Sequence, residues 1–141
     1  MAKSDSMKKE INKFLYFYRF LATVPYMSDC IFCKIANKEI PTQAVYEDDM
    51  VIAFNDLEPQ APVHVLVIPK KHIASLLATT AEDKELLAHI TCEVIPMLAK
   101  KLNIAENGFR TVVNTGEEGG QTVQHLHFHL LGGRSMQWPP G

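Results

Sequence analysis

Hydrophobic and polar residues alternate most regularly near the C-terminal end of the chain. The alternating residues are His125, Leu126, His127, Phe128, His129 and Leu130. Residues two positions apart on a β-strand point to the same side of the sheet. We therefore predict a strand over Thr122–Leu131 that buries its apolar side chains. Its other side presents three imidazoles, about 7 Å apart from one neighbour to the next.

Shorter apolar runs predict four more strands. They are Val45–Glu47, Met50–Phe54, His64–Ile68 and Phe109–Asn114. The first two runs meet at Asp48 and Asp49, which favour a turn, so we expect a hairpin there. Pro69 ends the third run, because proline cannot donate a hydrogen bond to a neighbouring strand.

Helical spacing dominates the middle of the chain. From Leu86 to Leu102 apolar residues recur every three or four positions, which predicts one long helix. Pro96 interrupts this pattern and predicts a kink or an irregular turn. Shorter helices are expected over Cys30–Asn37 and Lys71–Ala78. The predicted caps are Ser28 or Asp29 for the first short helix, and a capping box of Thr79 and Glu82 for the long helix.

The order of strands, long helix and further strands indicates an α+β fold. We predict a mostly antiparallel sheet covered by one long helix and one or two short helices. A chain of 141 residues suits one compact domain, and 47% hydrophobic residues suffice to build a core. We place that domain at residues 28–141 and treat residues 1–27 as an N-terminal extension.

The extension contains an apolar run that is only superficially similar to a signal sequence. Arg19 interrupts the run Phe14–Leu21, Glu10 lies in the basic part before it, and the run is too short to span a bilayer. Three interpretations stay open: a docked amphipathic helix, a peripheral anchor, or sequence upstream of a natural start at Met27. We expect no stable membrane insertion and no role for the extension in the chemistry.

Charge and cysteine content limit the partners and the compartment. The formal net charge is −2 and like charges form no block, which disfavours binding to nucleic acid. A small anionic ligand is compatible with this charge, because one pocket can be locally positive. The three cysteines, Cys30, Cys33 and Cys92, are too few and odd in number for a secreted disulfide framework. We therefore predict a cytoplasmic protein, with Cys92 in the core.

Three alternating imidazoles indicate chemistry rather than an incidental surface. The residues alone leave two interpretations open, a zinc site or a nucleophile, since imidazole titrates near neutral pH. The segment Gly119–Thr122 favours a phosphate ligand, because glycine lets backbone N–H groups approach closely and Thr122 adds a hydroxyl. Asn114, at the end of the preceding strand, can orient a side chain or an oxyanion. The segment is not a P-loop, because the lysine and the following helix are missing.

The segment His125–Leu131 resembles the signature of the histidine triad (HIT) family, His-φ-His-φ-His-φ-φ, at every position. Further similar segments are Asp29–Ile35, Lys38–Pro41, Ala53–Asp56, Pro59–Pro62, His64–Ile73, Gly119–Gln121 and Gly132–Gly141. The Trp-Pro-Pro-Gly end is similar to the Hint branch, the purine nucleoside phosphoramidases. This resemblance covers residues 28–141 and implies a HIT-like fold and a homodimer.

The resemblance also implies a reaction and its catalytic residues. The substrate is a nucleoside 5'-phosphoramidate of a purine nucleotide, of the AMP-amine or aminoacyl-adenylate type. His127 is the implied nucleophile, and its nucleotidyl-histidine intermediate releases the nucleoside monophosphate on hydrolysis. His129 binds the phosphate, and His64 assists proton transfer to the leaving amine.

The implied nucleotide site draws on several parts of the chain. Its phosphate contacts are Asn114, Gly120, Gln121, Thr122, His127 and His129. Its apolar slot for the base consists of Ile31, Phe32, Ile35, Ile40, Phe54 and Leu57. Asp56 matches the ribose-binding acid, since a carboxylate accepts two vicinal hydroxyls, and Trp138 reaches the partner's site. Asn55 stands where many Hint-branch relatives carry histidine, which affects fine ribose or loop contacts and not the reaction.

Cys30 and Cys33 lie one helical turn apart, so their thiolates can bind one zinc together with two imidazoles. The resemblance to zinc-binding bacterial relatives implies that His72 and His125 complete this set. The implied zinc is structural, because several relatives work without the cysteines, and catalysis needs no cofactor.

Two other functions remain as alternatives. The first is a dinucleoside polyphosphate hydrolase with the HIT fold, against which the C-terminal tail argues. The second is a nucleotide-binding regulatory protein with incidental hydrolysis, which the intact His127 disfavours.

Overall fold

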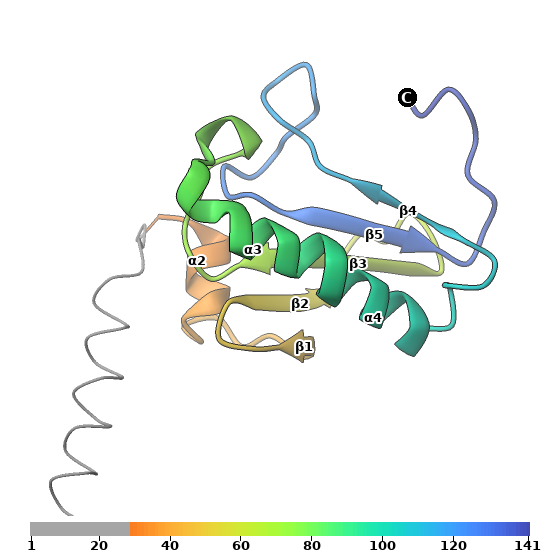
Figure 1. The fold of residues 1–141 in the computed structure, drawn as a ribbon, viewed down its shortest axis with the longest axis horizontal. Coiled ribbons are helices and arrows are strands. Elements are labelled where there is room, and N and C mark those ends of the chain that lie inside the picture. The colour runs from red at the N-terminus through yellow and green to blue at the C-terminus, as the bar shows by residue number, and fades with distance from the viewer. Residues whose placement is uncertain (1–28) are drawn as a thin grey trace, which may run out of the picture.

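The computed structural model describes residues 29–141, which build one antiparallel sheet with helices on both faces (Figure 1). The sheet order is β1-β2-β3-β5-β4. The strands are β1 Ala44–Glu47, β2 Val51–Asn55, β3 Val63–Pro69, β4 Phe109–Val112 and β5 Phe128–Gly132. The predicted α+β fold and the β1–β2 hairpin are confirmed. The interpretations of residues 1–27, and of Ser28 as a cap, lie outside the described residues.

The predicted long helix is one continuous element in the structure (Figure 1, green). It consists of α3 (Lys84–Ala88), a π-helical stretch (His89–Val94) and α4 (Ile95–Lys101). The predicted irregularity therefore lies in the turns before Pro96, where the missing N–H and the proline ring disturb the α-helical ladder. No helix within residues 29–141 is long and apolar enough to cross a membrane.

The three central strands β2, β3 and β5 are buried on both faces of the sheet, and alternation along β3 divides its side chains between these faces. Val65 and Val67 belong to the larger core cluster under α3 and α4. Leu66 and Ile68 belong to a second cluster under α2, Ile31–Ala36. His64 alternates in step with Leu66 and Ile68, so the smaller cluster packs on the same face of the sheet as the candidate site.

The short helix α2 begins at Ile31, and its N-cap is Cys30 rather than the predicted Asp29. The Cys30 Sγ accepts a hydrogen bond from the Cys33 backbone N–H at 3.4 Å, so the thiol itself is the N-cap. This N-cap turns both sulfur atoms toward the same side of the helix end.

The capping box before the long helix lies one residue later than predicted. Thr80 and Asp83 form it, rather than Thr79 and Glu82. The buried Asp83 accepts from the Thr80 backbone N–H at 2.8 Å and from Lys71 Nζ at 2.6 Å. The ion pair fixes Asp83 in this position, which sequence spacing alone did not reveal.

Three further local predictions are wrong in extent or burial. The helix predicted over Lys71–Ala78 is only a 3₁₀ turn at Leu76–Ala78. The last strand begins at Phe128 instead of Thr122, because the backbone before it bonds elsewhere: the Leu126 N–H donates to the Ile73 carbonyl at 2.6 Å. Cys92 is exposed on the long helix and does not lie in the core.

A cluster of ionisable side chains joins the β1–β2 turn to the long helix. His89 Nε2 lies 2.6 Å from Asp48 Oδ2, and His89 Nδ1 lies 2.7 Å from Glu93 Oε2. Tyr46 donates to the same Asp48 oxygen at 2.7 Å. The hydrogen bonds to both carboxylates raise the pKa of His89, chiefly through Asp48. Burial raises the pKa of Asp48, but hydrogen bonds from Tyr46, His89 and the backbone outweigh it and lower that pKa to about 2.

This cluster predicts how stability depends on pH. Because the folded state raises the pKa of His89, this residue contributes fully to folding stability below its pKa in the unfolded chain, about 6.5. The contribution is lost as pH rises through the pKa in the folded protein. The contribution of Asp48 is complete above its ordinary pKa of 3.8 and is lost as pH falls toward about 2. The difference in unfolding free energy between wild type and His89→Gln should therefore be largest near pH 5–6 and shrink by pH 9. Urea unfolding at each pH measures it, and a difference that grows above pH 7 would contradict the assignment.

Candidate active site

Two histidines from neighbouring strands meet at the centre of the candidate site. His64 lies on β3 and His129 on β5, and the strands pair with His129 opposite Leu66. His64 Nε2 lies 2.9 Å from His129 Nδ1, and their ring centroids are 5.2 Å apart. Burial, followed by the charges of His127 and His64, lowers the pKa of His129 to about 4. His129 is therefore neutral at neutral pH.

His127 is placed next to this pair and is buried, with 5% exposure. Its ring centroid lies 5.0 Å from that of His129. His127 Nδ1 lies 2.7 Å from the His125 carbonyl oxygen, which only accepts hydrogen bonds, so Nδ1 carries the proton. In the neutral ring, the second nitrogen, Nε2, then holds a lone pair. A neutral imidazole with a fixed, unprotonated Nε2 can act as a nucleophile.

The loop between β2 and β3 covers the outer side of His64. Asp56 Oδ2 lies 3.4 Å from His64 Nε2, and Asp56 Oδ1 accepts from the Glu58 backbone N–H at 2.9 Å. The backbone N–H of Gln60 donates to His64 Nδ1 at 3.0 Å. The structure thus brings the predicted Asp56, His64 and His129 together, with a hydrogen bond between the histidines and an ion-pair contact from Asp56 to His64.

The predicted phosphate-side residues lie on the loop between β4 and β5. Gly120 has φ +78°, a conformation that suits glycine, and Asn114 Nδ2 lies 3.5 Å from its carbonyl oxygen. The side chain of the buried Gln121 bonds to backbone groups: Nε2 donates to Ala74 and Val123 carbonyls, and Oε1 accepts from the Gly116 N–H. Gln121 therefore shapes the loop, while Thr122 is exposed.

The residues predicted for the base slot, together with Trp138 of the tail, include both buried and exposed side chains. Phe32 and Phe54 are buried in the smaller core cluster with their rings 5.8 Å apart, and Ile40 packs against them. Phe32 also contacts His127, with ring centroids 5.2 Å apart. Leu57 and Trp138 are instead 98% and 83% exposed. Within one chain, the structure brings Phe32 to the histidines and leaves Leu57 and Trp138 in solvent.

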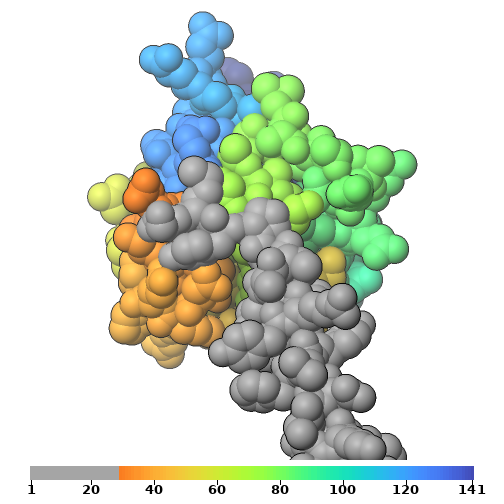
Figure 2. Space-filling view, turned by 90° about the vertical axis from the view of Figure 1, so that its left-hand side faces the viewer, coloured from red at the N-terminus to blue at the C-terminus, as the bar shows by residue number. Residues whose placement is uncertain are grey.

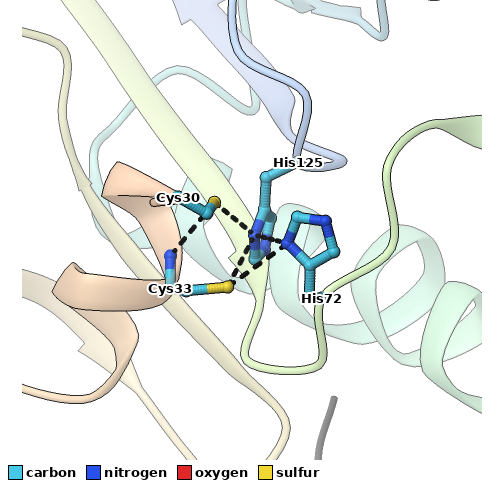
Figure 3. Close-up of side chains that lie close together, drawn as sticks. All are labelled: Cys30, Cys33, His72 and His125. Carbon is cyan, nitrogen blue, oxygen red and sulfur yellow. Dashed lines mark hydrogen bonds between the residues drawn. The ribbon is translucent and has the colours of Figure 1, made fainter. Parts of the chain in front are cut away.

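The four predicted metal ligands converge from three segments of the chain (Figure 3). Figure 2 shows these segments on one face, with α2 in orange, the segment after β3 in green and the segment before β5 in blue. The ligand atoms of Cys30, Cys33, His72 and His125 all lie within 4.8 Å of one another. Cys33 Sγ lies 3.2 Å from His72 Nδ1, and Cys30 Sγ lies 3.3 Å from His125 Nδ1.

The tautomer of His125 tests whether this set fits a metal ion. His125 Nε2 donates to the Pro69 carbonyl at 2.8 Å, so its Nδ1 holds a lone pair toward the sulfur atoms. Burial lowers the pKa of His125 to about 4 and also lowers the pKa of His72. Two thiols and two neutral imidazoles in this arrangement are the ligands that zinc prefers. The residues therefore fit a zinc ion, whose ligands do not include His127.

Three polar contacts of the site lie outside the sequence predictions. Two are backbone groups, the Pro69 carbonyl and the Gln60 N–H, and one is the Arg134 side chain, which donates from Nε to the Gln60 carbonyl at 2.9 Å. Backbone groups leave no signature in the residue pattern. In the sequence, Pro69, Gln60 and Arg134 fall within the family-like segments His64–Ile73, Pro59–Pro62 and Gly132–Gly141, which assign them no role.

Comparison with known proteins identifies the family. Residues 29–138 match the family described as scavenger mRNA decapping enzyme C-term binding. An uncharacterised HIT-like protein of Synechococcus elongatus is 58% identical over 113 residues, which are 80% of this chain and 97% of that protein. The chain belongs to the histidine triad family.

Other histidine triad proteins agree with this assignment. The adenylylsulfatase HINT1 of Arabidopsis thaliana is 46% identical over 123 residues, 86% of this chain and 82% of that protein. The solved HIT family hydrolase of Legionella pneumophila Philadelphia 1 has a TM-score of 0.78 and 51% identity, and the match covers 80% of this chain and all of that one. The resemblance seen in the triad motif and the HIT-like fold are thereby confirmed.

Proposed function

We propose that this histidine triad protein hydrolyses nucleoside 5'-phosphoramidates through a nucleotidyl-histidine intermediate. The observation that carries the proposal is the hydrogen bond from His127 Nδ1 to the His125 carbonyl, 2.7 Å long. It fixes the buried imidazole with its Nε2 lone pair available for attack. Imidazole is both a good nucleophile and a fair leaving group, as a two-step displacement requires.

In the first step, His127 Nε2 attacks the α-phosphorus and the P–N bond to the amine breaks. The departing nitrogen takes a proton that His64 helps to deliver, and the nucleotide stays bound to His127. In the second step, water attacks the same phosphorus, the bond to His127 breaks, and the proton from water returns to the histidine pair. The products are the free amine and the nucleoside monophosphate, and His127 is regenerated.

The nucleotide is proposed to lie across the histidines with its sugar toward Asp56. The Asp56 carboxylate, 20% exposed at its side chain, accepts hydrogen bonds from ribose hydroxyls. The phosphate-side contacts are Asn114, Gly120, Gln121 and Thr122, together with His127 and His129. The purine base lies near the apolar group of Ile31, Phe32, Ile40, Phe54 and Leu57.

We further propose that the working form is a cytoplasmic homodimer. Trp138 and Leu57 are large apolar side chains in solvent, which a second copy of the chain can cover. In this arrangement Trp138 contributes to the partner's nucleotide site. A reduced Cys30 and Cys33 pair suits the cytoplasm, where thiols stay available for a metal.

A structural zinc ion is proposed at Cys30, Cys33, His72 and His125. It would cross-link α2, the segment after β3 and the segment before β5. The cross-link would hold the backbone of His125, whose carbonyl orients His127. The ion supplies rigidity and takes no part in the bond-breaking steps.

Adenylyl sulfate is a second candidate substrate, because a relative that is 46% identical is named an adenylylsulfatase. Adenylyl sulfate and an AMP phosphoramidate share the α-phosphorus that His127 would attack, and they differ in the leaving group. One nucleophile can therefore serve both substrates. For a dinucleoside polyphosphate, the site must also accommodate the further phosphates and the second nucleoside.

A substrate comparison tests this proposal. The purified full chain receives AMP-tryptamine phosphoramidate, adenylyl sulfate and diadenosine tetraphosphate, and kcat/KM is measured for each. We expect the phosphoramidate to exceed the tetraphosphate by on the order of 100-fold or more, a difference of about 3 kcal/mol in transition-state stabilisation. Preference for the tetraphosphate, or turnover of none of the three, would refute the phosphoramidase proposal; preference for adenylyl sulfate would favour the second candidate.

A further inference from the structure

The proton on His64 is controlled by a main-chain group. The Gln60 N–H donates to His64 Nδ1 at 3.0 Å, so Nδ1 must be unprotonated. A neutral imidazole then carries its proton on the other nitrogen, Nε2. That nitrogen faces His129 Nδ1 at 2.9 Å. The amide therefore determines which of the two histidines is the donor.

The backbone around Gln60 is held in place from two sides. Arg134 Nε donates to the Gln60 carbonyl at 2.9 Å. Gly133 lies so close to the same loop that a Cβ there would approach the Pro62 Cβ to 2.9 Å. The Asp56 N–H closes the loop by donating to the His64 carbonyl at 2.9 Å. The start of the C-terminal tail thus packs directly on the loop that controls His64.

Two groups of residues in the described part of the chain have a geometry that could hold a metal ion, and the Gln60 amide disfavours metal binding at one of them. Asp56, His64 and His129 also bring their ligand atoms within 4.8 Å of one another. To bind a metal through Nε2, neutral His64 needs a proton on Nδ1, which would then face the Gln60 N–H. Two donors cannot form a hydrogen bond, so metal binding at His64 costs the amide contact. His125 differs, because the Pro69 carbonyl leaves its Nδ1 lone pair available.

We propose that the Gln60 main-chain amide, held by Arg134, is a positioning group that fixes His64 as its Nε2–H tautomer and keeps this histidine pair in proton transfer rather than metal binding. The inference deepens the proposed function, on which its catalytic consequence rests. Its structural content, the tautomer, is measured without any substrate.

The expected chain of hydrogen bonds follows from this tautomer. His64 Nε2–H donates to His129 Nδ1, so the proton of neutral His129 is on its Nε2. The lowered pKa of His129, about 4 because of burial, agrees with a neutral ring that accepts. His129 then offers an N–H donor to the phosphate. The alternative tautomer of His64 would reverse this chain and remove that donor.

The experiment is ¹⁵N NMR of the full chain with labelled histidine, using ¹⁵N–¹H correlations to assign each tautomer. We expect wild-type His64 to be protonated on Nε2 and His129 to be protonated on Nε2. Gln60→Pro removes the N–H, and we expect it to release His64 into a mixture with the Nδ1–H form. Gln60→Ala keeps the amide and removes only the side chain, so its His64 signals should match wild type. A wild-type His64 protonated on Nδ1, or a Gln60→Pro spectrum identical to wild type, would overturn the inference.

Arg134 variants give a second test that does not change the chain of the loop itself. Arg134→Ala should introduce the Nδ1–H form of His64 in part, and Arg134→Lys should restore some of the wild-type signal. With AMP-tryptamine phosphoramidate, kcat should fall by about 10- to 100-fold in Gln60→Pro while KM changes little, because a small misplacement of a catalytic group can cost about 100-fold in rate. If wild type does not turn over the phosphoramidate but its His64 is the Nε2–H tautomer, the proposed phosphoramidase function is refuted and the positioning role of the Gln60 amide is supported. If it turns over the substrate with the other tautomer, the positioning role alone fails.

Discussion

Replacing His127 with alanine is expected to reduce kcat for AMP-tryptamine phosphoramidate on the order of 10⁴-fold or more, because removal of a covalent nucleophile eliminates the two-step route. The variant keeps the neighbouring histidine pair, whose contact between His64 and His129 does not involve position 127. Substrate binding should therefore survive, with KM changed far less than kcat. Steady-state kinetics of wild type and variant measure both constants.

A labelled intermediate makes this test specific to covalent catalysis. Wild type mixed with substrate carrying ³²P at the α-position and quenched with denaturant should retain label on the protein, in a form labile to acid. His127→Ala should retain none. His89→Gln is the matched control, since His89 lies on the long helix and bonds to Asp48 and Glu93. Its labelling and kcat should match wild type, and full activity of His127→Ala would eliminate His127 as the nucleophile.

Sequence patterning predicted the sheet and the triad because both depend on strict periodicities. The helical spacing from Leu86 to Leu102 reappears as α3 to α4, and the alternation around His64 reappears in β3. Burial of Leu126, Phe128 and Leu130 confirms the apolar side of the triad segment. These features follow from side-chain hydrophobicity, which a sequence states directly.

The exact ends of the strands and helices depend on backbone hydrogen bonds, which cannot be read from a sequence. His125 and His127 precede β5 instead of lying on it, because the His125 side chain bonds to the Pro69 carbonyl and the Leu126 N–H to Ile73. Thr80 replaced Thr79 in the capping box because Asp83 pairs with Lys71, twelve residues earlier. Each correction arises from a contact between segments that are distant in the chain.

The candidate site shows the same division between side chains and backbone. Residue types predicted which histidines matter, but their different chemistry comes from three backbone groups. The His125 carbonyl leaves the Nε2 lone pair of His127, and the Pro69 carbonyl leaves the Nδ1 lone pair of His125. The Gln60 amide leaves the proton of His64 on Nε2. In the proposed mechanism, one residue type thereby supplies a nucleophile, a metal ligand and a proton donor within a single site.

Two members of the predicted nucleotide site are exposed in the single chain. Leu57 and Trp138 were predicted from family resemblance, and both stand in solvent here. Trp138 follows Gln137, whose carbonyl accepts from Arg110 of β4 at 2.8 Å, so the tail is tied to the edge of the sheet. β4 is an edge strand of this sheet, and an edge strand is a place where a second chain could extend a sheet. The proposed dimer would give both side chains their contacts.

Replacing Cys30 with serine is expected to remove zinc from the protein and to lower its melting temperature by about 10 °C, since a ligand bound only by the native state stabilises it by mass action. Serine is a good N-cap, so its Oγ can still accept from the Cys33 N–H that Cys30 Sγ now caps at 3.4 Å. The variant therefore removes a thiolate from the group that includes Cys33, His72 and His125 without removing the helix cap.

Metal analysis and thermal unfolding of the full chain measure the two effects. Wild type should hold about one zinc per chain, as expected of a closed site with two sulfur and two nitrogen ligands, and should lose the same stability on treatment with a strong chelator. Cys92→Ser is the matched control, because Cys92 is exposed on the long helix and outside the metal-ligand group. It should keep both its zinc and its melting temperature. If Cys30→Ser retains wild-type zinc, the proposed ligand set is wrong; if it loses zinc with no change in melting temperature, the ion is not structural. The second outcome would also mean that the backbone orienting His127 is held by the sheet and by α2 packing alone.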